Sequence, residues 1–155
     1  MNKQKKQSGF TIIEVVLVLA IAGLIFLMVF IALPALQRNQ RDGQRKNDLG
    51  RVKTALTNYM TSNRGNIPTS ALAVKSFQDK YLIPSDEYTD PQGEPYLLQY
   101  NQTPPTNGPA VGTIYYGNGR ICGADGQFDT GTARDYAMQI KLEGQSVPFC
   151  MDSKG

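Results

Sequence analysis

A run of 19 residues from Val15 to Leu33 without a charged side chain constrains this chain more than any other feature. At about 1.5 Å per residue, a helix over residues 10–36 spans about 40 Å, which is sufficient to cross a bilayer. Glu14 lies near the start of this segment, and a carboxylate inside a bilayer costs about 2.5–3.5 kcal/mol on insertion scales. The sequence therefore predicts a membrane-spanning helix whose carboxylate needs a positively charged partner.

The charges are distributed unevenly along the chain. The formal net charge is +3, and the first nine residues hold Lys3, Lys5 and Lys6, so the rest of the chain has 13 basic and 13 acidic side chains. Residues 37–64 have seven basic and two acidic side chains (+5), whereas residues 65–155 have six basic and ten acidic ones (−4). This pattern predicts a basic stem and an acidic head, without the overall positive charge typical of nucleic-acid-binding domains.

Several basic side chains of the stem are expected on the outer side of its helix. They could contact the acidic heads of neighbouring copies, or they could form an ordinary solvated face or bind anionic lipid. The residues concerned are Arg38, Arg41, Arg45 and Lys46.

The helix is predicted to continue beyond the apolar run to a total of about 50 residues, with a new apolar face. That face recurs at helical spacing, and residues 63–66 then give a stop signal. Gly23 and Pro34 weaken the helix within the apolar run. They are either tolerated, as in other membrane helices, or they make residues 23–34 able to unwind. The residues of the new face are Leu49, Val52, Leu56 and Tyr59, with Ala55 and Met60 beside them.

The rest of the chain predicts a small head domain of the α+β class. Ser70 is expected to cap a short helix through Tyr81 that Pro84 ends. Its buried side chains are predicted to be Leu72, Val74, Phe77 and Tyr81. Turn signals at 90–95 and 117–119 and loops at 103–112 and 123–131 separate four predicted strands. These are residues 96–100, 113–116, 136–142 (with Tyr136, Met138, Ile140 and Leu142 facing inward) and 149–151, and their close spacing indicates an antiparallel sheet.

Two cysteines, Cys122 and Cys150, follow the membrane-targeting segment, which favours one disulfide in an oxidising compartment over free thiols. The chain has no histidine, no nucleophile–base pair and no phosphate-binding glycine loop, so we expect no enzymatic activity, no cofactor and no metal. Asp125 and Asp129 lie in a glycine-rich loop, but two carboxylates fall short of the six to eight oxygens that Ca²⁺ prefers.

Residues 5–14, with the sequence KKQSGFTIIE, resemble the start of the type IV pilin and pseudopilin family. The resemblance implies that a prepilin peptidase cleaves between Gly9 and Phe10 and that the new N-terminal Phe10 is methylated. It also implies that Glu14, together with Thr11, acts in assembly, because the family's glutamate pairs with the N-terminal amine of a neighbouring subunit. Two opposite charges in a low dielectric attract strongly, which supports that pairing.

Two further segments are similar to parts of the same family. Ile83-Pro84 and residues 90–96 look like the turn before the sheet in major pseudopilins, and the Cys122–Cys150 pair resembles the disulfide-bounded end of many pilins. One departure is the proline: many members have it where this chain has Ile31, so unwinding of residues 23–34 is an expectation by resemblance.

The resemblance implies four segments and a structural role. Residues 1–9 are a leader that is cleaved, 10–36 the transmembrane and filament-core half of the helix, 37–64 its amphipathic half, and 65–155 the head. The expected product is a type IV pilus, a helical homopolymer that supports adhesion, motility or DNA uptake. A pseudopilin of a type II secretion or competence machine and an uncut single-span membrane protein are the alternatives.

The same resemblance implies the partners and the location of the chain. The partners are other copies of the chain, prepilin peptidase, the inner-membrane platform with its assembly ATPase, and membrane lipid before assembly. DNA and a host surface are candidate ligands of the filament. The subunit is expected in the cytoplasmic membrane with its head outside the cytoplasm, and afterwards in a pilus at the cell surface.

Overall fold

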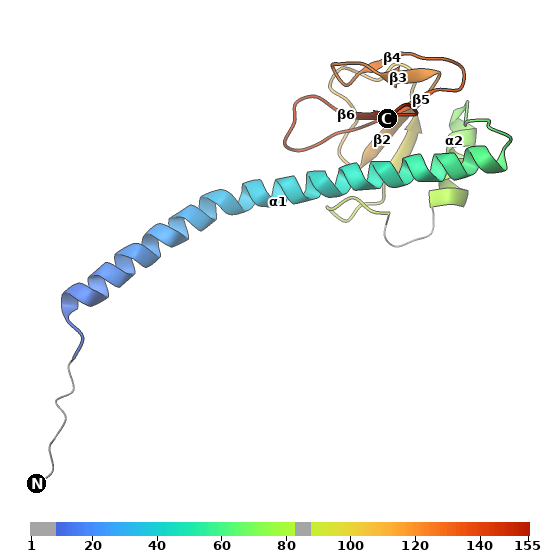
Figure 1. Cartoon of the computed structure of the whole chain (residues 1–155). Helices are drawn as coiled ribbons and strands as arrows, with labels where there is room; N and C mark the ends of the chain where they lie inside the picture. The colour runs from blue at the N-terminus through green and yellow to red at the C-terminus, as the bar shows by residue number, and fades with distance from the viewer. Residues whose placement is uncertain (1–8, 83–87) are drawn as a thin grey trace, which may run out of the picture. The chain divides into compact units, whose positions relative to one another are not determined.

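The computed structural model describes residues 9–82 and 88–155, and Figure 1 shows its elements. The chain divides into two compact units, one ending at Gln37 and the other beginning at Arg38. Helix α1 (Ile12–Ser62) is 51 residues long and contributes to both units, which confirms the predicted long helix. Ile83 and Pro84, which belong to the pseudopilin-like segment, lie outside the described residues.

The apolar half of α1 exposes its side chains. Among the described residues, α1 is the one helix long and apolar enough to cross a membrane, with a mean hydropathy of 3.2 and none of its apolar window buried. Pro34 lies inside α1, and the helix is continuous through it and through Gly23. Unwinding between these residues in another environment stays a prediction.

The amphipathic half of α1 begins the core of the head. As predicted, Leu49, Val52 and Leu56 are fully buried, and Tyr59 packs at the edge of the same cluster. They contact inward-facing side chains of the main sheet and of the short helix, so α1 covers one face of that sheet (Figure 1). The partners include Phe77, Tyr96, Ile114, Tyr116, Met138 and Ile140.

The prediction for the short helix is confirmed in part. The Ser70 hydroxyl accepts the N–H of Ala73 at 3.2 Å and caps α2 (Ala71–Phe77), which continues as a π-helical turn η1 (Gln78–Leu82). Val74 and Phe77 are buried, but the prediction for Leu72 is wrong, because 82% of this residue is exposed.

The predicted α+β class is confirmed, with one pairing that differs from a purely antiparallel sheet. The main sheet has the order β1-β2-β5-β6, where β2 (Thr113–Asn118), β5 (Tyr136–Ile140) and β6 (Phe149–Asp152) pair antiparallel. Strand β1 (Leu97–Tyr100) pairs with β2 in parallel, with Leu98 opposite Ile114. Parallel neighbours need a crossover of about a dozen residues or more, and the loop over 101–112 provides it.

A second, smaller sheet has one strand, β4 (Phe128–Thr130), in the segment 123–131, which is predicted to be loop. Strand β3 (Arg120–Cys122) pairs antiparallel with β4. Strand β5 is buried along its whole length, and Gln139 is fully buried where the alternating pattern predicted an outward side chain. The inward prediction for Met138 and Ile140 is confirmed, but a strand with both faces covered does not alternate.

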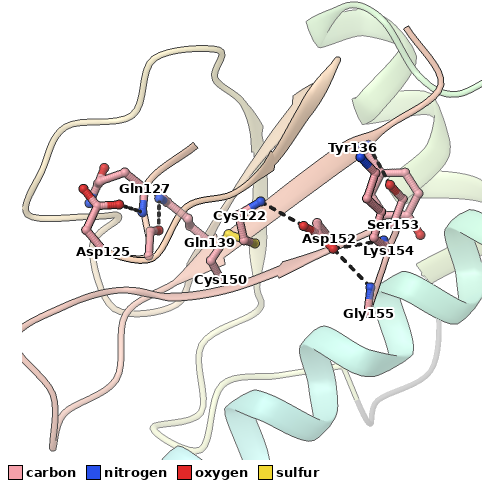
Figure 2. Close-up of a disulfide and its surroundings, with 11 residues drawn as sticks. Cys122, Asp125, Gln127, Tyr136, Gln139, Cys150, Asp152, Ser153, Lys154 and Gly155 are labelled. Carbon is pink, nitrogen blue, oxygen red and sulfur yellow. Dashed lines mark hydrogen bonds between the residues drawn. A yellow bond between two sulfur atoms is a disulfide. The ribbon is translucent and has the colours of Figure 1, made fainter. Parts of the chain in front are cut away.

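A disulfide joins Cys122 of β3 to Cys150 of β6, which confirms the predicted pairing (Figure 2). It connects the small sheet to the edge of the main sheet. Beside it, the N–H of Cys122 donates to the Asp152 carboxylate at 2.9 Å. Closing a loop of this length stabilises the folded head by about 3.5 kcal/mol on the chain-entropy estimate.

Candidate processing and assembly site

Thr11 and Glu14 form a reciprocal cap at the start of α1. The backbone N–H of Thr11 donates to Oε2 of Glu14 at 2.8 Å, and the Thr11 hydroxyl donates to the same oxygen at 2.7 Å. The N–H of Glu14 in turn donates to the Thr11 hydroxyl oxygen at 3.4 Å. This is a capping box, in which a threonine and a glutamate three residues later satisfy backbone donors that the helix leaves without partners.

The cap engages one of the two carboxylate oxygens of Glu14. Over residues 9–82 and 88–155, no hydrogen bond or ion pair involves the other oxygen, Oε1, and the side chain is exposed. The capping box therefore fixes the carboxylate at the first turn of an apolar helix. It leaves Oε1 available to a positively charged group from another molecule.

Gly9 and Phe10 lie just before this cap, in exposed and non-helical backbone. Among the described residues, no atom lies within 4 Å of a Cβ built at Gly9, and the φ of Gly9 lies outside the left-handed region. The fold itself therefore does not require glycine at this position. A requirement for glycine here would have to come from a molecule that recognises the extended segment.

A buried arginine, Arg45, holds the head on the second half of α1. Its side chain is fully buried and donates to both oxygens of Asp90, at 2.7 and 3.0 Å. Its Nη1 also donates to Glu143 at 2.9 Å and to Asp42 at 3.2 Å. These hydrogen bonds, those to Asp90 first, raise the pKa of Arg45 and keep its guanidinium charged.

The same cluster fixes the loop between β5 and β6. Arg41 donates to both oxygens of Glu143, at 2.9 and 2.6 Å. The backbone N–H groups of Glu143 and Gly144 each donate to the Asp42 carboxylate at 2.8 Å. Two arginines and three carboxylates thus join α1 to two loops that are distant in the sequence.

The pseudopilin-like turn at residues 90–94 docks on α1 through this cluster. Asp90 accepts the N–H of Gln92 at 3.0 Å, and its carbonyl accepts the N–H of Gly93 at 2.7 Å. Gly93 has a φ of +96°, a conformation that favours glycine. Just beyond the turn, the Tyr96 hydroxyl donates to Asp48 at 2.9 Å. The turn is therefore held at both ends by side chains of α1.

The prediction that the basic stem residues form the outer face is wrong for Arg45. For Arg41 it misses an ion pair within the same chain. Arg45 is fully buried, and Arg41 pairs with Glu143 of its own head. Lys46 lies over the ring of Phe149, 5.1 Å from its centroid. Part of the stem charge is therefore neutralised within the head unit and is not available to neighbouring copies.

Sequence reasoning missed two features of these sites. The capping box could have been found, because Thr11 and Glu14 have the T-x-x-E spacing before an apolar run. The Arg45 cluster gave no such signal, because Asp90 and Glu143 lie 45 and 98 residues from Arg45.

Acid should weaken the attachment of the head. Hydrogen bonds from Arg41, and then from Arg45, lower the pKa of Glu143 to about 2. Because an unfolded glutamate titrates near about 4.3, unfolding takes up a proton between these values, and this stabilisation is lost as the pH falls from about 4.3 towards 2. We expect the urea midpoint of the head to fall between about pH 6 and pH 3, and to fall less in Glu143→Gln.

Asp135 titrates in the same range and provides the comparison for that measurement. The backbone N–H and then the hydroxyl of Thr132 lower the pKa of Asp135 to about 2, so this carboxyl adds to the same acid loss. Asp135→Asn should also reduce the pH slope, and the two substitutions should do so independently. A slope unchanged in Glu143→Gln would contradict the contribution of Glu143.

Asp125 of the β3–β4 loop and Asp129 of β4 both lie close to Gly123. The Asp129 and Asp125 carboxylates both approach Gly123, within 2.9 and 3.1 Å of the position that a Cβ would take there. Asp125 accepts the N–H of Gln127 at 3.0 Å, as Figure 2 shows. Across the part of the chain that the structure describes, no three histidine, cysteine or acidic side chains are grouped to hold a metal ion.

Comparison with known families gives one match, and it covers the start of the chain. Residues 4–30 match the prokaryotic N-terminal methylation motif. No curated protein and no solved structure matches the chain. The matched residues include Gly9, Phe10, Thr11 and Glu14 and much of the apolar run, so the motif implies processing by a prepilin peptidase and fits membrane anchoring before assembly. By these residues the chain carries the leader and methylation motif of the type IV pilins and pseudopilins.

Proposed function

We propose that this chain is a structural subunit of a type IV pilus, which polymerises into a helical filament through α1 after its leader is removed. The observation that carries the proposal is a carboxylate fixed at the start of an exposed apolar helix, inside a leader and methylation motif. The role is structural and not enzymatic. Its partners are other copies of the chain, a prepilin peptidase, and the inner-membrane platform with its assembly ATPase.

The chemistry of assembly follows from the first five residues of the mature chain, Phe10 to Glu14. Cleavage between Gly9 and Phe10 creates an α-amine, and methylation keeps its positive charge. The amine of one copy pairs with the free Oε1 of Glu14 in a neighbour. In apolar surroundings that attraction is strong, whereas either charge alone is heavily penalised, so the pair fixes the axial register of the copies.

The apolar surface of α1 must be shielded from water both before and after assembly. Lipid covers it while the subunit is in the membrane, and the helices of neighbouring copies cover it in the filament. The head remains outside the cytoplasm throughout, where the Cys122–Cys150 disulfide is stable. The filament then serves adhesion, motility or DNA uptake at the cell surface.

A pseudopilin of a type II secretion or competence machine is the second candidate. The turn at residues 90–96 favours it, because this segment resembles the turn of major pseudopilins and is bound at both ends by Arg45 and Asp48. The two candidates share the leader, the apolar helix and the Glu14 pairing. They differ in the length and abundance of the polymer.

Sheared surface material distinguishes the candidates. Electron microscopy should show long filaments, and mass spectrometry should show that they consist mostly of this chain beginning at methylated Phe10. Processed chain that stays in the membrane without long filaments would instead favour the pseudopilin. A chain that retains Met1–Gly9 would contradict both candidates and favour a single-span membrane protein.

Replacing Gly9 with leucine should leave most of the chain as uncut precursor. The fold imposes no need for glycine at this position, so a loss of cleavage would report recognition by the peptidase. Immunoblotting of membranes should show a slower band that carries the leader. Gly23→Leu is the matched control, because a Cβ at Gly23 also meets no atom within 4 Å, and this variant should be cleaved normally.

A further inference from the structure

A polar hollow in the head lies where α1 ends and the β4–β5 loop passes. Its volume is about 430 Å³, within the range typical of small-molecule sites. Two arginines line it, one following α1 and the other in the loop, and within residues 9–82 and 88–155 no acidic side chain lines it. The lining includes Met60, Arg64, Asn66, Ile67, Thr69 and Arg134.

The two arginines at this hollow differ from those of the Arg45 cluster. Across residues 9–82 and 88–155, neither Arg64 nor Arg134 forms an ion pair or a side-chain hydrogen bond, and both are exposed. The carboxylate next to Arg134 is Asp135, which accepts from Thr132 and pairs with Lys154. Two positive charges therefore face one hollow without a partner from the described chain.

The backbone at Arg64 is in a conformation that arginine rarely adopts. Arg64 has a φ of +58°, and among the described residues it is the one non-glycine residue with a positive φ. The N–H of Gly65 donates to the carbonyl of Met60 at 2.7 Å, as in a Schellman motif, which places Arg64 at the position where glycine is preferred. Arginine is less stable than glycine in this conformation, so the Arg64 side chain is a candidate for a functional role.

The C-terminal end of α1 repels an anion in this hollow less than a helix end with unpaired carbonyl groups would. Negative partial charge gathers at a helix C-terminus on carbonyls without partners. Here the N–H of Gly65 donates to the carbonyl of Met60, and the Asn63 side chain donates to the carbonyl of Tyr59 at 2.8 Å. These two carbonyls of the last turn therefore have hydrogen-bond partners.

We propose that this hollow binds the carboxylate of an acidic monosaccharide, such as a uronic or sialic acid unit of a surface glycan. Arginine side chains bind carboxylates through paired hydrogen bonds, Asn66 and Thr69 can bond sugar hydroxyls, and Met60 and Ile67 offer an apolar contact for the ring. A nucleic acid fits less well, because no aromatic side chain among the described residues lines the hollow for a base to stack on. All of the lining residues belong to one chain, so binding of the sugar does not require the filament.

Binding can be measured on the full mature chain in detergent micelles. Saturation-transfer difference NMR should detect N-acetylneuraminic acid or glucuronic acid but not glucose. Arg64→Gly and Arg134→Gln should each weaken that binding by about 10-fold or more, since each removes a charged hydrogen-bond donor. Arg38→Gln removes an exposed arginine outside the hollow and should leave the affinity unchanged.

The Arg64→Gly variant also excludes misfolding as the cause of a loss. Glycine relieves the positive φ, so its Tm should equal or exceed that of the unsubstituted chain. Failure of both acidic sugars to bind, or unchanged affinity in Arg64→Gly and Arg134→Gln, would overturn the proposal. Inorganic phosphate binding as tightly as the acidic sugars would overturn the assignment to a sugar.

Discussion

Glu14→Gln should abolish filament assembly while leaving the chain cleaved, methylated and inserted in the membrane. Glutamine preserves the capping box, because its side-chain oxygen can accept from the N–H and hydroxyl of Thr11 as the carboxylate does. It removes the negative charge that the proposed pairing with the amine of a neighbouring copy requires. The variant therefore separates the two roles that the structure allows for Glu14, a helix cap and a charge partner.

Thr11→Ala is the complementary variant. It removes the hydroxyl that bonds Glu14 at 2.7 Å but keeps the carboxylate and the backbone N–H. Loss of a helix cap costs about 1 kcal/mol, and α1 extends far beyond its first turn. We therefore expect Thr11→Ala to assemble, with a modest decrease in yield, whereas Glu14→Ala should fail as Glu14→Gln does.

Three measurements on each strain decide the outcome. Immunoblotting of membranes checks export and cleavage, mass spectrometry checks methylation of Phe10, and electron microscopy of sheared material measures filaments. Normal filament yield from Glu14→Gln would contradict the charge pairing and leave Glu14 as a helix cap. Failure of Thr11→Ala together with normal assembly of Glu14→Gln would show that the cap is what assembly needs.

Features encoded by local spacing could be predicted from the sequence. The apolar run and the Leu49, Val52 and Leu56 face define α1, and the cap at Ser70 defines the start of α2. The disulfide was predictable because the chain offers a single possible pair, Cys122 and Cys150. The cleavage motif could be read because its order of residue types is specific over a few positions.

Features set by contacts between distant residues could not be predicted in this way. The parallel pairing of β1 with β2 depends on where the 101–112 loop returns, and no local pattern encodes that direction. The burial of Gln139 arises because β5 is covered on both faces. Arg45 shows the largest error, since a charged residue on an amphipathic helix is normally exposed and here its neighbours neutralise it.

The Arg45 cluster gives the head a defined position on the second half of α1. In a filament built through α1, forces on the head pass to the helix through this attachment and through the apolar core. A buried ion pair often adds less stability than a well-packed apolar contact. Removing one partner, however, leaves the charge of the other partner buried and unpaired, which is costly. The cluster therefore penalises any arrangement in which the turn at residues 90–94 or the β5–β6 loop leaves α1.

Arg45→Met should destabilise the head by about 3–5 kcal/mol, because it leaves the Asp90 carboxylate buried without its partner. That is a large share of the roughly 5–15 kcal/mol by which native proteins are stable. Urea unfolding of the mature chain in detergent, followed by near-ultraviolet circular dichroism of the tyrosines, measures the loss. Arg41→Gln is the control: the Arg41 side chain is 30% exposed and Glu143 keeps its ion pair with Arg45, so the cost should be near 1 kcal/mol or less.

Adding Asp90→Asn to Arg45→Met identifies the cause of that loss. If the cost arises from the unpaired carboxylate, neutralising Asp90 should recover part of the stability, and the double variant should be more stable than Arg45→Met alone. If the arginine acts mainly by filling space, methionine already supplies similar volume and the second substitution should add its own penalty. Equal losses in Arg45→Met and Arg41→Gln would contradict the distinction between the buried Arg45 and the partly exposed Arg41, and with it the role of Arg45 in holding the head on α1.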